Sequence, residues 1–199
     1  MPFSFHLMKE KKEKKRWGLI FFIILIMVGT SVSFVFFGFQ PQNDIVKYNG
    51  VRLVNQNNIW IAKINGKEAA FSFLPSEVES VAASKDFSQK LKDKLEIDVT
   101  YDLNSTHKEA IALAQHQMWL TLAQYNIYAR KGFTANNTFN LPVITCNGSS
   151  VNVPVVYFRQ GNSTNINLED NCIIAEAPSN EGFIKVKDRL LYGILGVMK

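Results

Sequence analysis

Residues 95–125 read LEIDVTYDLNSTHKEAIALAQHQMWLTLAQY, and the predicted fold depends on them. Residues 95–101 are strand-like, with β-branched and aromatic residues in most positions. Thr106 and Glu109 have the spacing of a helix capping box, and Gly132 stands where the helix would stop. A strand followed by a long helix predicts the first half of a β-α-β crossover. The expected helix has one apolar stripe, formed by Ile111, Ala114, Met118, Leu122 and Tyr125.

The residues that follow supply further elements of the same domain. Residues 141–145 are the expected returning strand, so the order of elements favours a parallel, right-handed crossover. Residues 153–158 and 166–177 are two more strand candidates, and their close spacing favours hairpins. Weaker helical periodicity is present at 84–95. A last helix is expected over 180–198, with an apolar face of Phe183, Val186, Leu190, Ile194 and Val197.

The residues before this region predict an antiparallel meander. Three strand-like runs occupy 48–54, 58–64 and 67–73. Asn65 and Gly66 separate the last two runs and favour a type I′ hairpin, because both central residues of that turn need a positive φ. The sequence therefore predicts an α+β fold, with a meander at about 46–74, then a helix, strand, helix, strands and helix over about 84–199. A mixed sheet covered by helices is the expected architecture.

An apolar segment precedes the domain. Residues 17–39, 23 in a row, carry no ionisable side chain, and a helix of this length spans about 34 Å. That is enough to cross a bilayer, so we predict a transmembrane helix. A cleaved signal peptide is the alternative, but its apolar region is usually about 7–15 residues long and ends in small residues. This segment runs on through Phe36, Phe37 and Phe39 and favours an uncleaved anchor.

The charges that flank this segment predict its orientation. Residues 1–16 contain six basic and two acidic side chains, whereas only Lys47 and Arg52 are basic in the 20 residues after the segment. The positive-inside bias places residues 1–16 in the cytoplasm as a basic tail and residues 40–199 outside, so the predicted location is the cell membrane, spanned once. The tail supplies +4 of the net charge of +5, and the outer domain has no charge excess to attract nucleic acid.

A search for catalytic and metal-binding motifs gives no assigned residue. His107 and His116 are nine apart on the expected helix and lack the i, i+4 spacing of a helical zinc site. No G-x-S-x-G, G-x-G-x-x-G or P-loop motif occurs. Asp98 and Asp102 stand near the end of a strand, where catalytic carboxylates often lie, although turn formation and capping are more common roles. We therefore predict no catalytic, cofactor-binding or metal-binding residue.

Two further groups have two interpretations each. Trp119, Tyr125 and Tyr128 could line a ligand groove or a partner surface, but aromatic residues at helical spacing more often belong to the core. Asp188 and Arg189 interrupt the apolar last helix. They either form a partly buried ion pair or face water.

The only two cysteines of the chain are Cys146 and Cys172. Two cysteines are too few for a structural zinc site, no histidine lies near them, and they lack C-x-x-C spacing. Because the predicted topology places them in a compartment that permits disulfides, we predict that they pair. Two buried free thiols in neighbouring strands remain the alternative.

Four sequons of the N-x-S/T type are candidate glycosylation sites. Random placement of the Asn, Ser and Thr residues of the outer domain would give roughly two, so four is a mild excess. The predicted topology and the polar context make them plausible acceptors. Thr106 belongs to one of them and is also expected to cap a helix. The acceptor residues are Asn104, Asn136, Asn147 and Asn162.

Residues 171–198, NCIIAEAPSNEGFIKVKDRLLYGILGVM, carry a resemblance to a known group of proteins. Together with YNGVRLV at 48–54, IWIAKING at 59–66 and FSFLPSEVE at 71–79, they resemble uncharacterised, single-pass membrane-anchored proteins predicted in archaea. The resemblance implies an archaeal cell surface and a shared fold. It assigns no activity, so no functional residue is carried over.

Three functions are consistent with these observations. The first is a membrane-anchored binding, scaffolding or cell-envelope module, held by residues 17–39, whose outer domain meets another envelope protein or a glycan. The second is an extracytoplasmic hydrolase, which would require Asp98, Asp102 or His107 within hydrogen-bond reach of a Ser or Thr. The third is a pilin-like filament subunit, although Arg16 is followed by Trp17 and not directly by a small residue.

Overall fold

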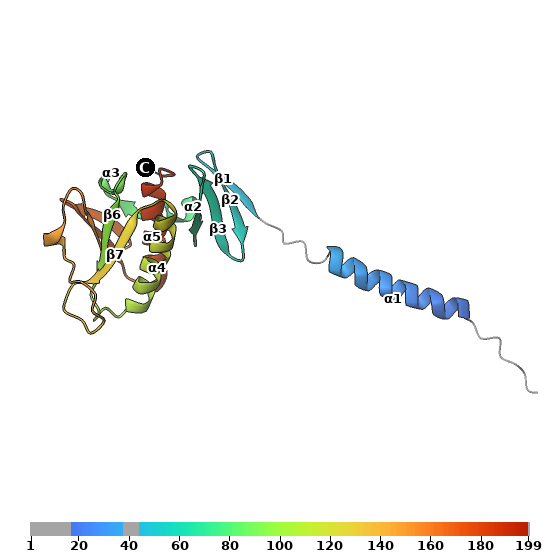
Figure 1. Ribbon diagram of the computed structural model, residues 1–199. Coiled ribbons are helices and arrows are strands. Elements are labelled where there is room, and N and C mark those ends of the chain that lie inside the picture. The colour runs from blue at the N-terminus through green and yellow to red at the C-terminus, as the bar shows by residue number, and fades with distance from the viewer. Residues whose placement is uncertain (1–16, 38–43, 199) are drawn as a thin grey trace, which may run out of the picture. The chain divides into compact units, whose positions relative to one another are not determined.

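The computed structural model describes residues 17–37 and 44–198, which belong to two compact units, residues 1–42 and 43–199 (Figure 1). In the first unit the helix α1 spans Trp17–Phe37, and side chains are described for residue 18 and residues 20–29. Among the described residues, no helix is both long and apolar enough to cross a membrane. The predicted basic tail, residues 1–16, and the end of the predicted span, residues 38–39, lie outside the described residues.

The second unit begins with a four-stranded antiparallel meander, here called sheet A. The sequence predicts three strands, because it takes residues 48–54 as one strand. In the structure Asn49 and Gly50 have φ of 45° and 81° and make a turn there, as Asn65 and Gly66 do with 50° and 82°. The type I′ geometry predicted for Asn65-Gly66 is therefore confirmed by the signs of φ, and a second Asn-Gly turn adds a strand. The strands are β1 (Ile45–Tyr48), β2 (Val51–Gln56), β3 (Ile59–Ile64) and β4 (Lys67–Phe71).

A six-stranded sheet, here called sheet B, follows in the order β5-β9-β10-β8-β6-β7. The strands β7, β6, β8 and β10 are mutually parallel, and β9 is antiparallel to β10. Residues 166–177, predicted as one strand, form two antiparallel strands, β9 and β10. The hairpin predicted between residues 153–158 and this segment is wrong, because β8 and β10 run parallel. The predicted mixed sheet is confirmed. Its strands are β5 (Ala82–Ala83), β6 (Glu96–Tyr101), β7 (Tyr128–Phe133), β8 (Val155–Gln160), β9 (Asn165–Glu169) and β10 (Cys172–Ala177).

The helix α4 (Lys108–Gln124) makes the predicted crossover but returns to a different strand. The parallel partner of β6 is β7, and residues 141–145 contribute only the isolated bridge of Val143 to Phe133. The helix ends earlier than predicted because Asn126 takes φ of 60°. Gly132 therefore does not stop a helix. It lies in β7, where a Cβ atom would be 2.5 Å from the carbonyl oxygen of Pro142, so the loop packs directly on the strand.

Helices α4 and α5 (Asn180–Ile194) form the layer between the two sheets (Figure 1). The predicted apolar stripe is buried as expected, but the helix predicted over 180–198 ends at Ile194, so Val197 is buried beyond its end. The helix predicted over 84–95 is confirmed only as α3 (Phe87–Leu91), and Leu95 is 81% exposed. A short helix α2 (Pro75–Val78) and the 3-10 turn η1 (Cys146–Gly148) complete the unit. The α+β prediction is confirmed, with sheet A covering the side of the helices that sheet B leaves open.

Candidate functional site at the carboxyl edge of sheet B

The carboxyl ends of four parallel strands meet at one edge of sheet B. The connection from β6 leads through α4 to β7, whereas β8 pairs with the opposite side of β6. Such a switch of direction opens a crevice between neighbouring strand ends, and ligands of open α/β sheets bind at that place. The ends of β6 and β8 are therefore the candidate location of a site. The strands end at Phe133 (β7), Tyr101 (β6), Gln160 (β8) and Ala177 (β10).

Two hydrogen bonds between polar side chains span the edge. The Thr106 hydroxyl donates to Gln160 Oε1 at 3.0 Å, which ties the loop after β6 to the end of β8. His107 Nδ1 lies 2.6 Å from Asn180 Oδ1, and its ring lies 5.7 Å from that of Phe183. The capping box predicted at Thr106 is wrong, because the residue at the N-cap of α4 is His107 and its side chain makes no capping bond. The side chain of Thr106 is used across the crevice instead.

The two carboxylates considered in the sequence, Asp98 and Asp102, both accept hydrogen bonds from within the domain. Both oxygens of Asp98 accept hydrogen bonds of 2.7 Å from Arg130 of β7, and Arg130 also lies 3.3 Å from Glu96. The bond to Asp98 is the main cause that raises the pKa of Arg130. Asp102 does stand at the carboxyl end of β6, where its Oδ1 accepts the backbone N–H of Asn104 at 2.9 Å. Asp98 therefore belongs to an ion pair, which was not predicted, and Asp102 has the predicted turn role.

The side chains required for the hydrolase hypothesis do not converge. The partners of Asp98, Asp102 and His107 are Arg130, the backbone of Asn104 and Asn180. None of the three side chains forms a hydrogen bond with a Ser or Thr side chain within the described chain. The Ser105 hydroxyl accepts the backbone N–H of residue 107, which is a turn contact. The arrangement that would support a nucleophile and its base is therefore not formed.

The three aromatic residues on and after α4 point to different surroundings. The Tyr125 hydroxyl donates to the carbonyl oxygens of Ile64 and Lys67, 3.1 and 3.2 Å away, and so fastens α4 to the β3-β4 turn. Trp119 is half-buried, with the Lys131 ammonium 5.0 Å from its ring centre. Tyr128 lies on β7 and is 59% exposed. They do not form one groove, and Tyr125 has the core role.

α5 contains a buried ion pair of Lys187 and Asp188, of which the sequence analysis indicated only Asp188. Asp188 is completely buried, and its Oδ1 accepts a bond from the equally buried ammonium of Lys187 at 2.5 Å. Its Oδ2 accepts the backbone N–H groups of Ser72 and Phe73, each at 2.9 Å. Burial is the main cause that raises the pKa of Asp188, while the ammonium and the two N–H groups oppose it. The partner is Lys187 and not Arg189, and the cluster joins α5 to the end of β4.

Arg189 lines a cleft beside α3. The cleft has a volume of about 1380 Å³ and lies between the loop that carries α3, the end of α4 and the C-terminal residues. The Arg189 guanidinium stacks 5.4 Å from the ring centre of Phe87, and burial lowers its pKa. Asp98, Asp102 and His107 do not line this cleft. Charged side chains of both signs line its wall beside Arg189: Lys85, Asp86, Lys92, Asp93 and Lys94.

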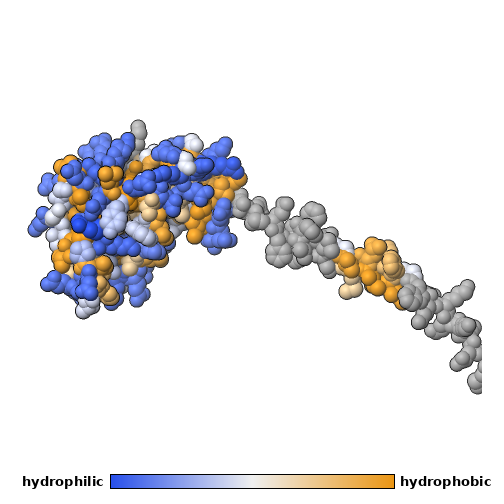
Figure 2. All heavy atoms as spheres, in the orientation of Figure 1, coloured by the Kyte–Doolittle hydropathy of each residue, from blue (hydrophilic) through white to orange (hydrophobic). Residues whose placement is uncertain are grey.

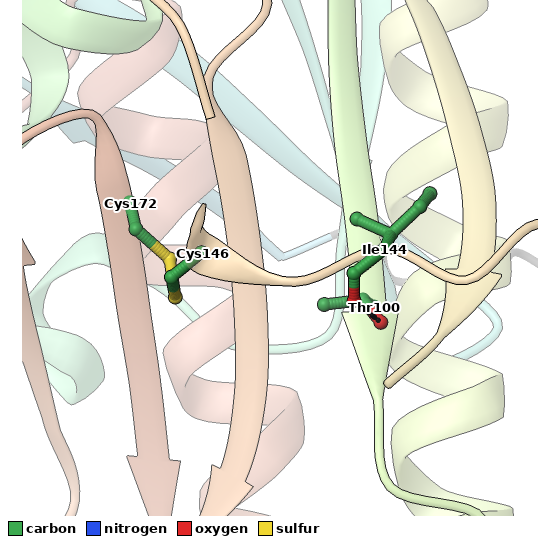
Figure 3. The surroundings of a disulfide bond; sticks show 4 residues. All are labelled: Thr100, Ile144, Cys146 and Cys172. Carbon is green, nitrogen blue, oxygen red and sulfur yellow. Dashed lines mark hydrogen bonds between the residues drawn. A yellow bond between two sulfur atoms is a disulfide. The ribbon is translucent and has the colours of Figure 1, made fainter. Parts of the chain in front are cut away.

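The two cysteines form the predicted disulfide (Figure 3). Cys146 of η1 and Cys172 at the start of β10 have Cα atoms 5.2 Å apart. Beside the bond, the Thr100 hydroxyl donates to the Ile144 carbonyl oxygen at 2.9 Å (Figure 3). Ile144 packs with Val155 and Ile174 into a second small core on the face of sheet B that the helices do not cover. The disulfide therefore holds the loop after β7 on this face.

The four sequon asparagines are exposed, as an acceptor must be, and their glycosylation stays a prediction. Three of them follow strands that end at the same edge of sheet B. Asn104 follows β6, Asn136 follows β7 and Asn162 follows β8. Asn147 lies in η1 beside the disulfide.

Within the described part of the chain, no group of three or more His, Cys, Asp or Glu side chains could hold a metal ion. No protein-family model, curated protein or solved structure matches the chain. The functional conclusion therefore rests on the residues themselves.

Proposed function

We propose that the chain is a membrane-anchored protein whose residues 40–199 form an extracytoplasmic binding or scaffolding module of the cell envelope. One observation carries the proposal: an uncharged helix is followed by a folded domain that contains the Cys146–Cys172 disulfide. Disulfides persist in oxidising compartments and are rare in the cytosol. The resemblance to archaeal membrane-anchored proteins agrees with this assignment.

The anchor is supported by the sequence of residues 17–39, which extends beyond the residues that the structure describes. The helix α1 has 21 residues, and residues 17–39 hold no ionisable side chain. Phe21, Phe22 and Leu25 of this helix are 69%, 63% and 60% exposed, as apolar side chains that contact lipid would be. A bilayer is the environment in which such a helix is stable, because its backbone hydrogen bonds are satisfied internally.

Binding is favoured over catalysis by the polar edge of sheet B. Thr106, His107, Gln160 and Asn180 offer polar hydrogen-bonding groups, while among the described residues no carboxylate or imidazole there is paired with a hydroxyl nucleophile. Such groups suit recognition of a polar surface or a glycan. Membrane-permeable crosslinking of the full chain in intact cells, followed by mass spectrometry, tests this role. Recovery of neither a second protein nor a glycan nor a second copy would count against it.

The topology is tested with the full chain carrying a C-terminal tag. Protease added to intact cells or spheroplasts should digest the domain, and carbonate extraction should leave the chain in the membrane. Leu25→Arg places a charge near the middle of α1, which costs about 3 kcal/mol, and should release most of the chain from the membrane. Gly18→Arg, beside the basic tail, is the matched control and should stay anchored.

Two results would overturn the proposal. One is a domain that resists external protease until the membrane is permeabilised. The other is a mature protein whose N-terminal sequence begins near residue 17, which would support the pilin-like alternative instead.

A further inference from the structure

Sheet A has a face that points away from the helices, here called the outer face. Side chains of a strand alternate between the two faces, and the buried Leu53 and Ala62 mark the inner one. The strand register aligns the outer-face residues of all four strands in one row. This row is entirely apolar and consists of Ile45, Val54, Ile61 and Ala70.

The row is partly open to solvent in the domain, since Ile45 and Ala70 are exposed and Val54 and Ile61 are half-buried. Ile45 is 50% exposed, and Ile59, which precedes Ile61 on the same face of β3, is 46% exposed. Hydrophobic and hydrophilic residues lie side by side on this part of the surface (Figure 2). Single exposed apolar residues are ordinary, whereas contiguous ones mark a contact surface. An apolar row that crosses a whole sheet therefore indicates a binding surface.

The row continues beyond the edge strand β4. A groove of about 270 Å³ runs between β4 and α4, with Ile61 and Ala70 on one wall and Leu120 on the other. Leu120 is 48% exposed. The apolar surface therefore extends from β1 at one edge of sheet A to α4 beyond the other edge.

Basic residues flank the apolar row on the same face. Lys47 pairs with Arg52 in the β1-β2 register, and Lys63 pairs with Glu68 in the β3-β4 register. Lys47, Arg52 and Lys63 are exposed, and no described carboxylate lies within ion-pair distance of any of them. The face thus combines apolar side chains with a net positive charge, which suits an anionic surface.

The chain itself limits how far this face can be from the end of α1. Residues 38–44 connect Phe37 to Ile45, the first residue of the row, and a fully extended chain of that length reaches roughly 28 Å. A surface at the end of α1 is therefore always within reach of sheet A. Tethering on this scale keeps the local concentration of such a surface high.

We infer that the outer face of sheet A docks on the surface of the membrane in which α1 is anchored. Ile45, Ile59 and Ile61 enter the interface, and Lys47 and its basic neighbours contact anionic lipid headgroups. A second copy is a poorer occupant, because each face has a net charge of +2, from three basic side chains against Glu68, and two such faces repel each other. The inference rests on the proposed membrane anchor.

The test uses the full chain in lipid nanodiscs, with a nitroxide on Ile59→Cys. The native cysteines are joined and do not react with the label. In discs that contain phosphatidylglycerol, the label at 59 should collide readily with oxygen and poorly with a water-soluble nickel complex. Asn167→Cys, exposed on β9 of sheet B, is the matched control and should show the reverse.

A charge variant tests the lipid chemistry. Replacing Lys47, Arg52 and Lys63 by Gln should lower the ratio of docked to undocked domain roughly 100-fold in anionic discs. The nickel accessibility of the label at 59 should then approach that of the label at 167. An unchanged accessibility would overturn the role of the basic residues, and an intact disulfide and near-UV spectrum control for folding.

The remaining outcomes separate the two proposals. If the chain enters the discs but the label at 59 is as accessible to nickel as that at 167, the docking inference is overturned and the anchor stands. If the chain does not enter the discs, the anchor is overturned, and the inference with it. If the label at 59 is shielded from oxygen and nickel alike and shows dipolar broadening, a second copy covers the face and lipid docking is overturned.

Discussion

Replacing Asp188 by Asn should destabilise the domain strongly. The substitution removes the charge that compensates the fully buried ammonium of Lys187. It also weakens the acceptor of two backbone N–H groups, those of Ser72 and Phe73 at the end of β4. Removal of one partner of a buried pair leaves an uncompensated charge, which costs about 3–5 kcal/mol. We expect a loss of that size in the free energy of unfolding.

The double substitution separates this effect from a simple loss of packing. Lys187→Met should by itself cost roughly as much as Asp188→Asn, since it also leaves a single buried charge. The double variant has no buried charge, and the Asn oxygen can still accept one of the two N–H groups. It should therefore lose only about 1–2 kcal/mol. The coupling free energy between the two positions is then about 4 kcal/mol or more, the difference between the summed single losses and the loss of the double variant.

Urea unfolding of residues 43–199 measures these changes, because this unit contains the whole described core. With a slope of roughly 2 kcal/mol per molar urea, each single variant should lower the midpoint by about 2 M. Lys185→Met is the matched control on the same helix. Lys185 pairs with Glu181 at the surface, and its replacement should cost about 0.3–0.5 kcal/mol.

Additivity would refute this reasoning. If the double variant loses as much as the two single variants together, the two side chains do not compensate each other's charge. A loss below about 1 kcal/mol for Asp188→Asn would refute the burial of the pair itself.

Three further predictions concern the rest of the domain. Replacing Cys146 and Cys172 by Ser opens a cross-link between residues 26 apart and should cost about 3.5 kcal/mol in the chain-entropy model, measured by urea unfolding with and without reductant. Gly132→Ala should cost about 1–3 kcal/mol, because the new Cβ would overlap Pro142, whereas Gly148→Ala, with open space around it, should change the stability little. The free energy of unfolding should also fall as the pH rises above about 10, because tyrosines whose pKa is raised keep their protons in the folded state while the unfolded chain loses them. Each such tyrosine contributes up to about 1.4 kcal/mol per pH unit. A constant free energy of unfolding between about pH 10 and 11 would contradict this. The hydrogen bond to Glu79 is the main cause that raises the pKa of Tyr48. Burial is the main cause that raises the pKa of the other four tyrosines: Tyr101, Tyr125, Tyr157 and Tyr192.

Elements with a long apolar period were predictable from the sequence. The buried face of α5 and the crossover helix α4 follow from spacing, and burial of a stripe is what that spacing encodes. The strand β7 was missed because the apolar stripe of α4 ends at Tyr125 and Gly132 was taken as its stop. The signal that could have found the true end is Asn126, a residue type that tolerates positive φ.

The candidate sites were less predictable, since their contacts are made over long distances along the chain. The disulfide followed from the predicted compartment and the absence of other cysteines. The two charges next to each other in an apolar helix indicated a special position, but the partners of Asp188 at Ser72 and Phe73 are more than 100 residues away. Periodicity shows which face of a helix is buried and says nothing of which backbone groups meet it.

The distribution of the sequons bears on which surface can face the membrane. Residues 44–103 contain no N-x-S/T sequon, whereas Asn104, Asn136 and Asn162 all follow strands of sheet B. A glycan is bulky and hydrated and cannot be accommodated between a protein face and lipid headgroups. If these three asparagines carry glycans, the carboxyl edge of sheet B must stay in water, while the outer face of sheet A has no such requirement. Docking through sheet A and recognition of a partner at the edge of sheet B are therefore compatible in one molecule.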